Sequence, residues 1–202
     1  MNLNITRRDG TKEAFDADRI NRALERACAG LPDVVGKVIQ IGTETELSLY
    51  DGITEEEIDE ATINTALQNV KDDPDYDKVA TRLLLKTVYK RILGDYERNN
   101  SVIVAERHVE IFPKYIKQAV ADGLLDKRME NFDLEELAKY IDTSRDELFQ
   151  YAGLSTLLHR YSLKDKNNIS QETPQLFFMR VSMGLAYNEA NPTEWAKKFY
   201  DK

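Results

Sequence analysis

The sequence predicts a mainly α-helical protein with a small β-sheet at its N-terminal end. Apolar residues recur at helical spacing through most of the 202 residues, whereas the first stretch of the chain alternates in the manner of strands. Asp9-Gly10 lies between two such alternating segments, and an Asp-Gly pair in that position is the strongest short-range signal of a β-hairpin with a two-residue turn. We therefore expect one hairpin followed by a succession of helices.

The N-terminal half contains short strands and four helices by this reasoning. The predicted strands are Leu3–Arg7 and Lys12–Phe15, and we expect Leu49–Asp51 to add a third. Glycine and proline stop the first helix, and Thr54 followed by Glu57 forms a capping box at the start of the third. The predicted helices cover residues 17–29, 34–47, 54 to about 71, and 76 to 94 or 96.

The C-terminal half is predicted to be helical throughout, beyond a polar boundary at Asn99-Asn100-Ser101. This boundary divides the chain into domains of residues 1–97 and 98–202. Pro174 suits the first turn of a helix, because the N–H that proline lacks has no partner there. The predicted helices cover residues 102–122, 134–140, 145–161 and 173–187, and a last one starts at 194.

Composition excludes several classes of protein. The net charge of −8 and the pI near 5.0 argue against a general nucleic-acid or membrane-surface binder. No apolar run approaches the roughly 20 residues of a membrane span, and no signal peptide is visible. The single cysteine, Cys28, rules out an internal disulfide and is consistent with a reducing, cytoplasmic setting. Its apolar neighbours fall at helical spacing, which predicts a small core residue. His108 and His159 are expected at surface or half-buried positions on helices.

Charged residues gather around the predicted hairpin. Guanidinium groups and helix N-termini suit phosphate, whereas carboxylates accept hydrogen bonds from ribose hydroxyls or an adenine amino group. The pattern therefore favours a regulatory nucleotide site, although exposed hairpins are also charged simply for solubility. The residues concerned are Arg7, Arg8, Glu13, Asp16, Arg19 and Arg22.

The stretch I-T-R-R-D-G-T-K-E-A-F-D, residues 5–16, followed by D-R-I, resembles the ATP-cone family. The resemblance implies a four-helix bundle capped by a small three-stranded sheet, and a site for ATP or dATP as allosteric effector, with Mg²⁺ accompanying the nucleotide. It implies phosphate contacts from basic residues, including Lys90 on the fourth helix, and base and ribose contacts from Glu13 and Asp16. The implied nucleotide-binding residues are Ile5, Arg7, Arg8, Glu13, Ala14, Phe15, Asp16, Arg19, Thr54, Glu55 and Lys90.

Two positions depart from that family. Glu55 stands where the family has a threonine, with Thr54 just before it, and Asp59 stands where the family has a histidine. Two carboxylates there would repel an unshielded triphosphate. Either Mg²⁺ bridges them to the nucleotide, or the nucleotide binds with a different tilt.

The second half carries another resemblance. Residues 149–154 and the stretch E-T-P-Q-L-F-F-M-R-V-S-M-G-L-A, residues 172–186, look like the start of the large-subunit core of class I ribonucleotide reductase. D-Y-x-x-x-A-x-R-L, residues 75–83, is similar to the exit helix of that family's ATP-cone. The resemblance implies helices that lead into an α/β barrel absent from this chain. The last stretch taken alone is also what any buried amphipathic helix shows.

The family's chemistry needs several cysteines, so a chain with one cysteine has no catalytic residues and is not competent alone. The resemblance implies the N-terminal regulatory portion of an enzyme of deoxyribonucleotide synthesis, an oxidoreductase. Its partners would be the remainder of the large subunit, in the same or a separate chain, a radical-generating small subunit, and further copies of this chain joined through the cone. Two alternatives remain: a free-standing ATP-cone sensor, and a helical interaction module without a ligand.

Overall fold

The computed structural model describes residues 3–7, 10–94 and 101–202. The chain forms two compact units, Met1–Thr87 and Val88–Lys202, and the long helix α4 (Asp75–Leu93) contributes residues to both. The predicted boundary between residues 97 and 98 lies outside the described residues, so the division into domains 1–97 and 98–202 stays a prediction.

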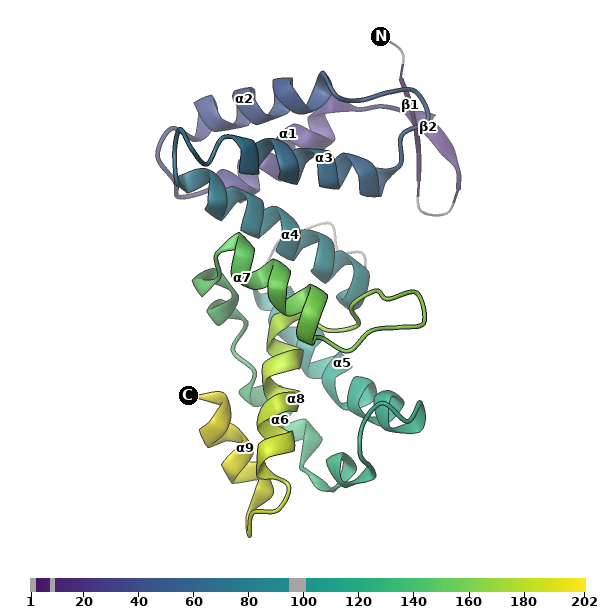
Figure 1. The fold of residues 1–202 in the computed structure, drawn as a ribbon, viewed down its shortest axis with the longest axis vertical. Coiled ribbons are helices and arrows are strands. Elements are labelled where there is room, and N and C mark those ends of the chain that lie inside the picture. Colours follow the sequence, from purple (N-terminus) through teal and green to yellow (C-terminus); the bar gives the residue numbers. More distant parts are fainter. Residues whose placement is uncertain (1–2, 8–9, 95–100) are drawn as a thin grey trace. The chain divides into compact units, whose positions relative to one another are not determined.

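The first unit begins with an antiparallel hairpin, β1 (Asn4–Thr6) and β2 (Lys12–Ala14) (Figure 1). The register pairs Thr6 with Lys12, which leaves three residues between Arg7 and Thr11. The predicted two-residue Asp9-Gly10 turn is therefore wrong, because that turn would pair residue 8 with Thr11. Three-residue hairpin loops also require a glycine at a left-handed position. Gly10 has φ +83°, and its N–H donates to the Arg7 carbonyl at 2.9 Å.

The predicted third strand at Leu49–Asp51 does not form, and this prediction is corrected. The Oδ1 atom of Asp51 accepts a hydrogen bond from the Asn4 N–H at 2.8 Å, so a side chain takes the donor that a neighbouring strand would use. Pairing with β1 starts after it: Thr6 N–H donates to the Ile53 carbonyl at 2.8 Å, and Thr6 and Thr54 form one parallel bridge. The sheet thus has two strands and an adjoining bridge.

The four predicted helices of the first unit are confirmed. Asp16, Asp33 and Thr54 cap the N-termini of the first three, and the Thr54–Glu57 capping box is present. Fully buried apolar side chains from these helices form the core, and Cys28 is one of them, as predicted. The helices are α1 (Ala17–Cys28), α2 (Val34–Glu46), α3 (Glu55–Gln68) and α4.

The second unit is helical, and most of its predicted helices are confirmed. It contains α5 (Ser101–Ala121), the 3₁₀ helix η1 (Lys127–Asn131), α6 (Leu134–Tyr140), the 3₁₀ helix η2 (Thr143–Leu148), α7 (Tyr151–Thr156), the π-helical turn η3 (Leu157–Tyr161), α8 (Pro174–Ala186) and α9 (Pro192–Tyr200).

The predicted single helix over residues 145–161 is wrong. The chain there forms η2, α7 and η3, with extended backbone at Phe149 and Gln150. The Phe149 ring stacks on Phe178, with 6.2 Å between ring centroids. Buried and aromatic contacts of this kind decide the local conformation against the helical periodicity.

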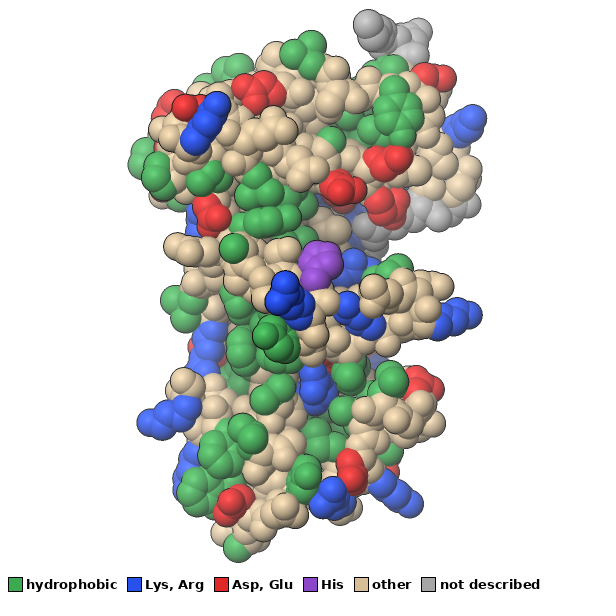
Figure 2. All heavy atoms as spheres, viewed as in Figure 1, with side chains coloured by type: hydrophobic (Ala, Val, Ile, Leu, Met, Phe, Trp, Pro, Cys, Tyr) green, Lys and Arg blue, Asp and Glu red, His purple; other side chains and the backbone are tan. Residues whose placement is uncertain are grey.

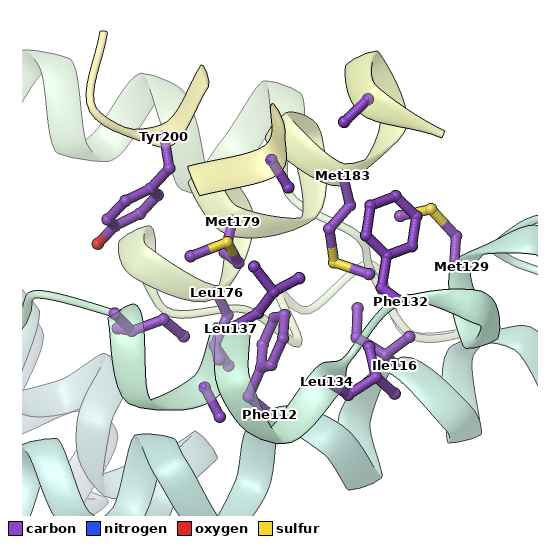
Figure 3. Packing of buried hydrophobic residues seen from close by; sticks show 14 residues of the cluster. Phe112, Ile116, Met129, Phe132, Leu134, Leu137, Leu176, Met179, Met183 and Tyr200 are labelled. Carbon is purple, nitrogen blue, oxygen red and sulfur yellow. The ribbon is translucent and has the colours of Figure 1, made fainter. Parts of the chain in front are cut away.

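One apolar cluster holds the second unit together. Figure 3 shows side chains from α5, α6 and α8 that converge on a common interior. The helix that carries P-Q-x-x-x-M-R-V supplies Leu176, Met179 and Met183, each of which is fully buried. Across the described residues, no helix combines the length and apolar character that crossing a membrane requires.

Candidate functional site

In the first unit, the hairpin, α1 and α3 bring charged side chains together in a continuous chain of ion pairs. Arg7 Nη2 lies 2.5 Å from Glu13 Oε2, and Arg19 Nη1 lies 2.6 Å from the other oxygen of the same carboxylate. The second guanidinium nitrogen of Arg19 lies 2.8 Å from Glu55 Oε1. Cation and anion thus alternate from the end of β1, through β2 and α1, to the first turn of α3.

Local structure explains why these residues meet. Glu13 pairs in register with the buried Ile5, and residues directly opposite in an antiparallel pair share one face of the sheet. Asp16 caps α1 just after β2, which places Arg19 in the first turns of that helix. The bridge between Thr6 and Thr54 holds the start of α3 beside β1. Glu55, the first residue of α3, therefore lies next to the hairpin.

A further ion pair lies one helical turn along α3. Lys86 on α4 is 3.1 Å from Asp59, and residues four apart on a helix share a face. Glu55 and Asp59, the two acidic departures from the resembled family, are thus each paired with a cation. Figure 2 shows acidic side chains gathered over the end of α3 that lies beside the hairpin.

We call these six residues the charge cluster: Arg7, Glu13, Arg19, Glu55, Asp59 and Lys86. Its three cations and three carboxylates give it a formal charge of zero. Arg19 keeps 39% of its side chain exposed, whereas Glu55 keeps 13%. A ligand in solution can therefore reach the guanidinium, although its charge is already compensated.

Lys86 was missed by sequence reasoning, which selected Lys90 on the same helix. The two lysines are four residues apart and so share a face of α4, a spacing that could have pointed to both. Lys90 is half-buried and falls in the second unit, so its place in the site stays a prediction.

The other predicted residues take various positions. Ile5 is buried in the core and pairs with Glu13 in the hairpin. Ala14 is exposed, and Phe15 is half-buried, with its N–H donating to the Leu3 carbonyl at 2.8 Å. Arg8 lies outside the described residues.

Asp16 and Thr54 both act as helix caps in the structure. Asp16 is exposed, accepts from the Asp18 N–H at 3.0 Å, and lies 3.4 Å from Arg22. The Thr54 hydroxyl accepts from the Glu57 N–H at 3.2 Å and donates to the Glu57 carboxylate at 2.8 Å. Hydrogen bonds from Thr54 and from the Tyr50 hydroxyl lower the pKa of Glu57, so the first turn of α3 stays negatively charged at neutral pH.

The donor set suits phosphate better than it suits a bare metal ion. Guanidinium groups bind phosphate through parallel N–H···O hydrogen bonds. Within the described part of the chain, no three histidine, cysteine, aspartate or glutamate residues are grouped to hold a metal ion. Mg²⁺ keeps several waters and commonly binds through one or two carboxylates together with substrate phosphates.

Comparison with known protein families places two domains on the chain. Residues 3–91 match the ATP cone domain, and this matched stretch includes the whole charge cluster. Residues 147–202 match the ribonucleotide reductase all-alpha domain, and this second stretch includes α8 and its buried methionines.

Curated relatives match over nearly the whole chain. The ribonucleoside-diphosphate reductase subunit alpha of Chlamydia trachomatis is 34% identical over 199 residues, which are 98% of this chain and 19% of the relative. The subunit of the same name from Helicobacter pylori is 34% identical over 98% of this chain and 24% of its own length. Ribonucleoside-diphosphate reductase 1 subunit alpha of Escherichia coli is 28% identical over 100% of this chain and 26% of its own length. The chain thus spans about a fifth to a quarter of these relatives.

Proposed function

We propose that this chain is the nucleotide-sensing regulatory portion of a ribonucleotide reductase. It is a relative of ribonucleoside-diphosphate reductase alpha subunits, and it matches the ATP cone domain and the ribonucleotide reductase all-alpha domain. The observation that supports the proposal most strongly is the charge cluster. It lies within the ATP cone match and brings side chains from the hairpin, α1, α3 and α4 together. ATP or dATP is the proposed ligand, accompanied by Mg²⁺.

The cations of the cluster are proposed to hold the phosphates. Arg19 offers a planar fork of N–H donors that matches phosphate oxygens, and Arg7 and Lys86 add positive charge on either side. Arg8 and Lys90 belong to the same proposed phosphate side. A bound nucleotide supplies the negative charge that these groups then pair with.

The base and ribose are proposed to contact Glu13 and Asp16. ATP and dATP differ only in the 2′-hydroxyl, so a group beside the ribose must detect it. Asp16 is exposed at the start of α1, and its carboxylate can accept a hydrogen bond from that hydroxyl. A coupling of about 1–3 kcal/mol between this contact and a neighbouring domain is enough for five- to 150-fold regulation.

The catalytic step is proposed to reside outside these residues. Cys28 is the single cysteine, is fully buried, and has a pKa raised by burial, so it does not supply a reactive thiolate. The proposed partners are the remainder of a large subunit, in the same or a separate chain, and a radical-generating small subunit. Further copies of the chain would associate through the cone, and the setting would be the cytoplasm.

Calorimetric titration of the full chain with ATP and Mg²⁺ tests this proposal. Losing the charge-assisted hydrogen bonds of Arg19 costs about 1.5–3 kcal/mol, so Arg19→Ala should bind ATP about ten- to 150-fold more weakly. Arg26→Ala, an exposed change two turns further along α1, is the matched control and should bind like the wild type. Equal affinity of a folded Arg19→Ala variant and the wild type would contradict the proposal.

The same titration separates the two lysines of α4. Loss of affinity in Lys86→Ala would assign that side chain to the phosphates, and loss in Lys90→Ala would support the residue that the family resemblance implies. The double variant Arg7→Ala with Lys90→Ala is expected to abolish binding of both ATP and dATP without unfolding the chain. Unchanged affinity in that folded double variant would remove both residues from the site.

A further inference from the structure

We infer that Glu55 is a built-in competitor for the phosphates of the nucleotide. Its carboxylate is paired with the Arg19 guanidinium, and a bound phosphate must replace it there. This inference rests on the proposed function, because it concerns how the same site is regulated. It gives Glu55 a role opposite in sign to that of a residue that binds the ligand.

The position of Glu55 satisfies the two preferences that a phosphate would have. Its Oε1 atom lies 2.8 Å from Arg19 Nη2, within the range of a charge-assisted hydrogen bond. It is also the first residue of α3, where the helix dipole favours negative charge and where phosphates bind in many proteins. The carboxylate therefore takes both the donor and the helix end that a phosphate would use.

The rest of the charge cluster follows the same arrangement. Glu13 lies between Arg7 and Arg19, and Asp59 pairs with Lys86. Because the cluster has no formal net charge, a polyanion gains little from long-range attraction. It gains only by exchanging carboxylate partners for phosphate partners. Glu55 is the most buried of the three carboxylates of the cluster, with 13% of its side chain exposed against 31% for Glu13 and 22% for Asp59.

A different role for Glu55 predicts the opposite result. If Glu55 bound Mg²⁺ that accompanies the nucleotide, removal of its charge would weaken the binding of Mg²⁺ and ATP. If Glu55 competes with phosphate, removal of its charge strengthens binding. The sign of the change in affinity distinguishes the two roles.

The test is calorimetric titration of the full chain with two probes, ATP with Mg²⁺ and tripolyphosphate without it. Glu55→Gln keeps the size of the side chain and removes the charge. Glu60→Gln makes the same change in net charge at an exposed position of α3 and is the matched control. Exposed and half-buried ion pairs contribute up to about 1 kcal/mol, so Glu55→Gln should bind both probes about three- to fivefold more tightly. Glu60→Gln should bind like the wild type.

The outcomes separate this inference from the proposed function. Tighter tripolyphosphate binding in Glu55→Gln, with no ATP binding in any variant, would support the competitor and refute the nucleotide sensor. Tripolyphosphate binding to Glu55→Gln that is unchanged or weaker than binding to the wild type would overturn the inference, as would a failure of both probes to bind any variant. The capping box of Thr54 and Glu57 is untouched by the change, and Glu55→Ser provides a second neutral variant should Glu55→Gln not fold.

Discussion

Asp146 is a carboxylate buried among polar partners in the second unit. Its side chain accepts hydrogen bonds from the Tyr89 hydroxyl and from Gln175 Nε2, the latter at 2.6 Å. The Tyr200 hydroxyl in turn donates to Oε1 of the Gln175 side chain at 2.5 Å. Burial raises the pKa of Asp146 to about 6, because few water molecules remain to stabilise its charge.

His108 is a second buried titratable group, with the opposite effect on stability. The sequence predicted a surface or half-buried position, but the ring is fully buried. Nδ1 lies 2.7 Å from the Val104 carbonyl and must donate to it, so Nε2 accepts from the Thr173 hydroxyl at 2.8 Å. Burial lowers the pKa of His108 to about 4, and the imidazole is neutral in the folded protein.

These two pKa values set the pH dependence of folding in the same window. For Asp146, the folded state binds more protons than the unfolded state above about pH 4, so stability decreases as pH rises towards 6. For His108, the unfolded state binds more protons between about pH 4 and 6.5, so stability increases as pH rises. Each group contributes about 3 kcal/mol, so the two largely offset one another.

Asp146→Asn should therefore expose the contribution of His108. We expect the free energy of unfolding of this variant to rise by about 3 kcal/mol between pH 4 and pH 6.5, whereas that of the wild type changes much less. Urea titrations at several pH values measure this, and the fluorescence of Trp195, the only tryptophan, reports on the second unit. Parallel pH profiles for the two proteins would contradict the assignment of the raised pKa to Asp146.

At the level of elements, the hairpin loop and α8 each contain a glycine with a distinct role. Gly10 has φ +83°, a left-handed conformation that is costly for any residue with a Cβ atom. Gly184 lies inside α8, where alanine is the better helix former. A Cβ atom added at either position would meet nothing within 4 Å, so packing does not complicate the comparison.

The two alanine substitutions should consequently have opposite effects. Gly10→Ala should destabilise the first unit by about 1–2 kcal/mol, and Gly184→Ala should stabilise the second unit by up to about 1 kcal/mol. Thermal unfolding followed by circular dichroism measures both changes. A Gly10→Ala variant as stable as the wild type would contradict the left-handed loop conformation.

The elements also show how far local sequence signals determine this fold. The Thr54–Glu57 capping box and the glycine and proline stops, together with apolar periodicity, predicted the four helices of the first unit. The hairpin loop length, the third strand and the helix over residues 145–161 were predicted wrongly. In the last two of these segments a contact distant in the sequence decides the backbone: Asp51 with Asn4, and Phe149 with Phe178. Periodicity contains no information about such contacts.

Only the part of the site that depends on local sequence signals could be predicted. The turn and strand signals brought Arg7, Glu13 and Arg19 together, because all three lie within a short stretch of chain. Glu55 was included only through the family resemblance, Asp59 was noted only as a departure from that family, and Lys86 was missed. Pairings between helices depend on packing angles that the sequence of one helix does not determine.

At the scale of the whole molecule, the charge is distributed unevenly. The chain has a net charge of −8, yet the charge cluster is formally neutral and keeps an accessible guanidinium at Arg19. An acidic chain repels polyanions in general, so a phosphate-binding site in it must rely on short-range hydrogen bonds. The proposed nucleotide site and its carboxylate competitor both follow from this balance.

Hydrogen–deuterium exchange of the full chain with and without saturating ATP and Mg²⁺ tests the central claim most directly. If the charge cluster holds the nucleotide, amide exchange should slow in peptides that cover the β1–β2 hairpin, the first turns of α1 and the first turn of α3. Unchanged exchange in all three regions, with slower exchange elsewhere in the chain, would show that the nucleotide binds at a different place.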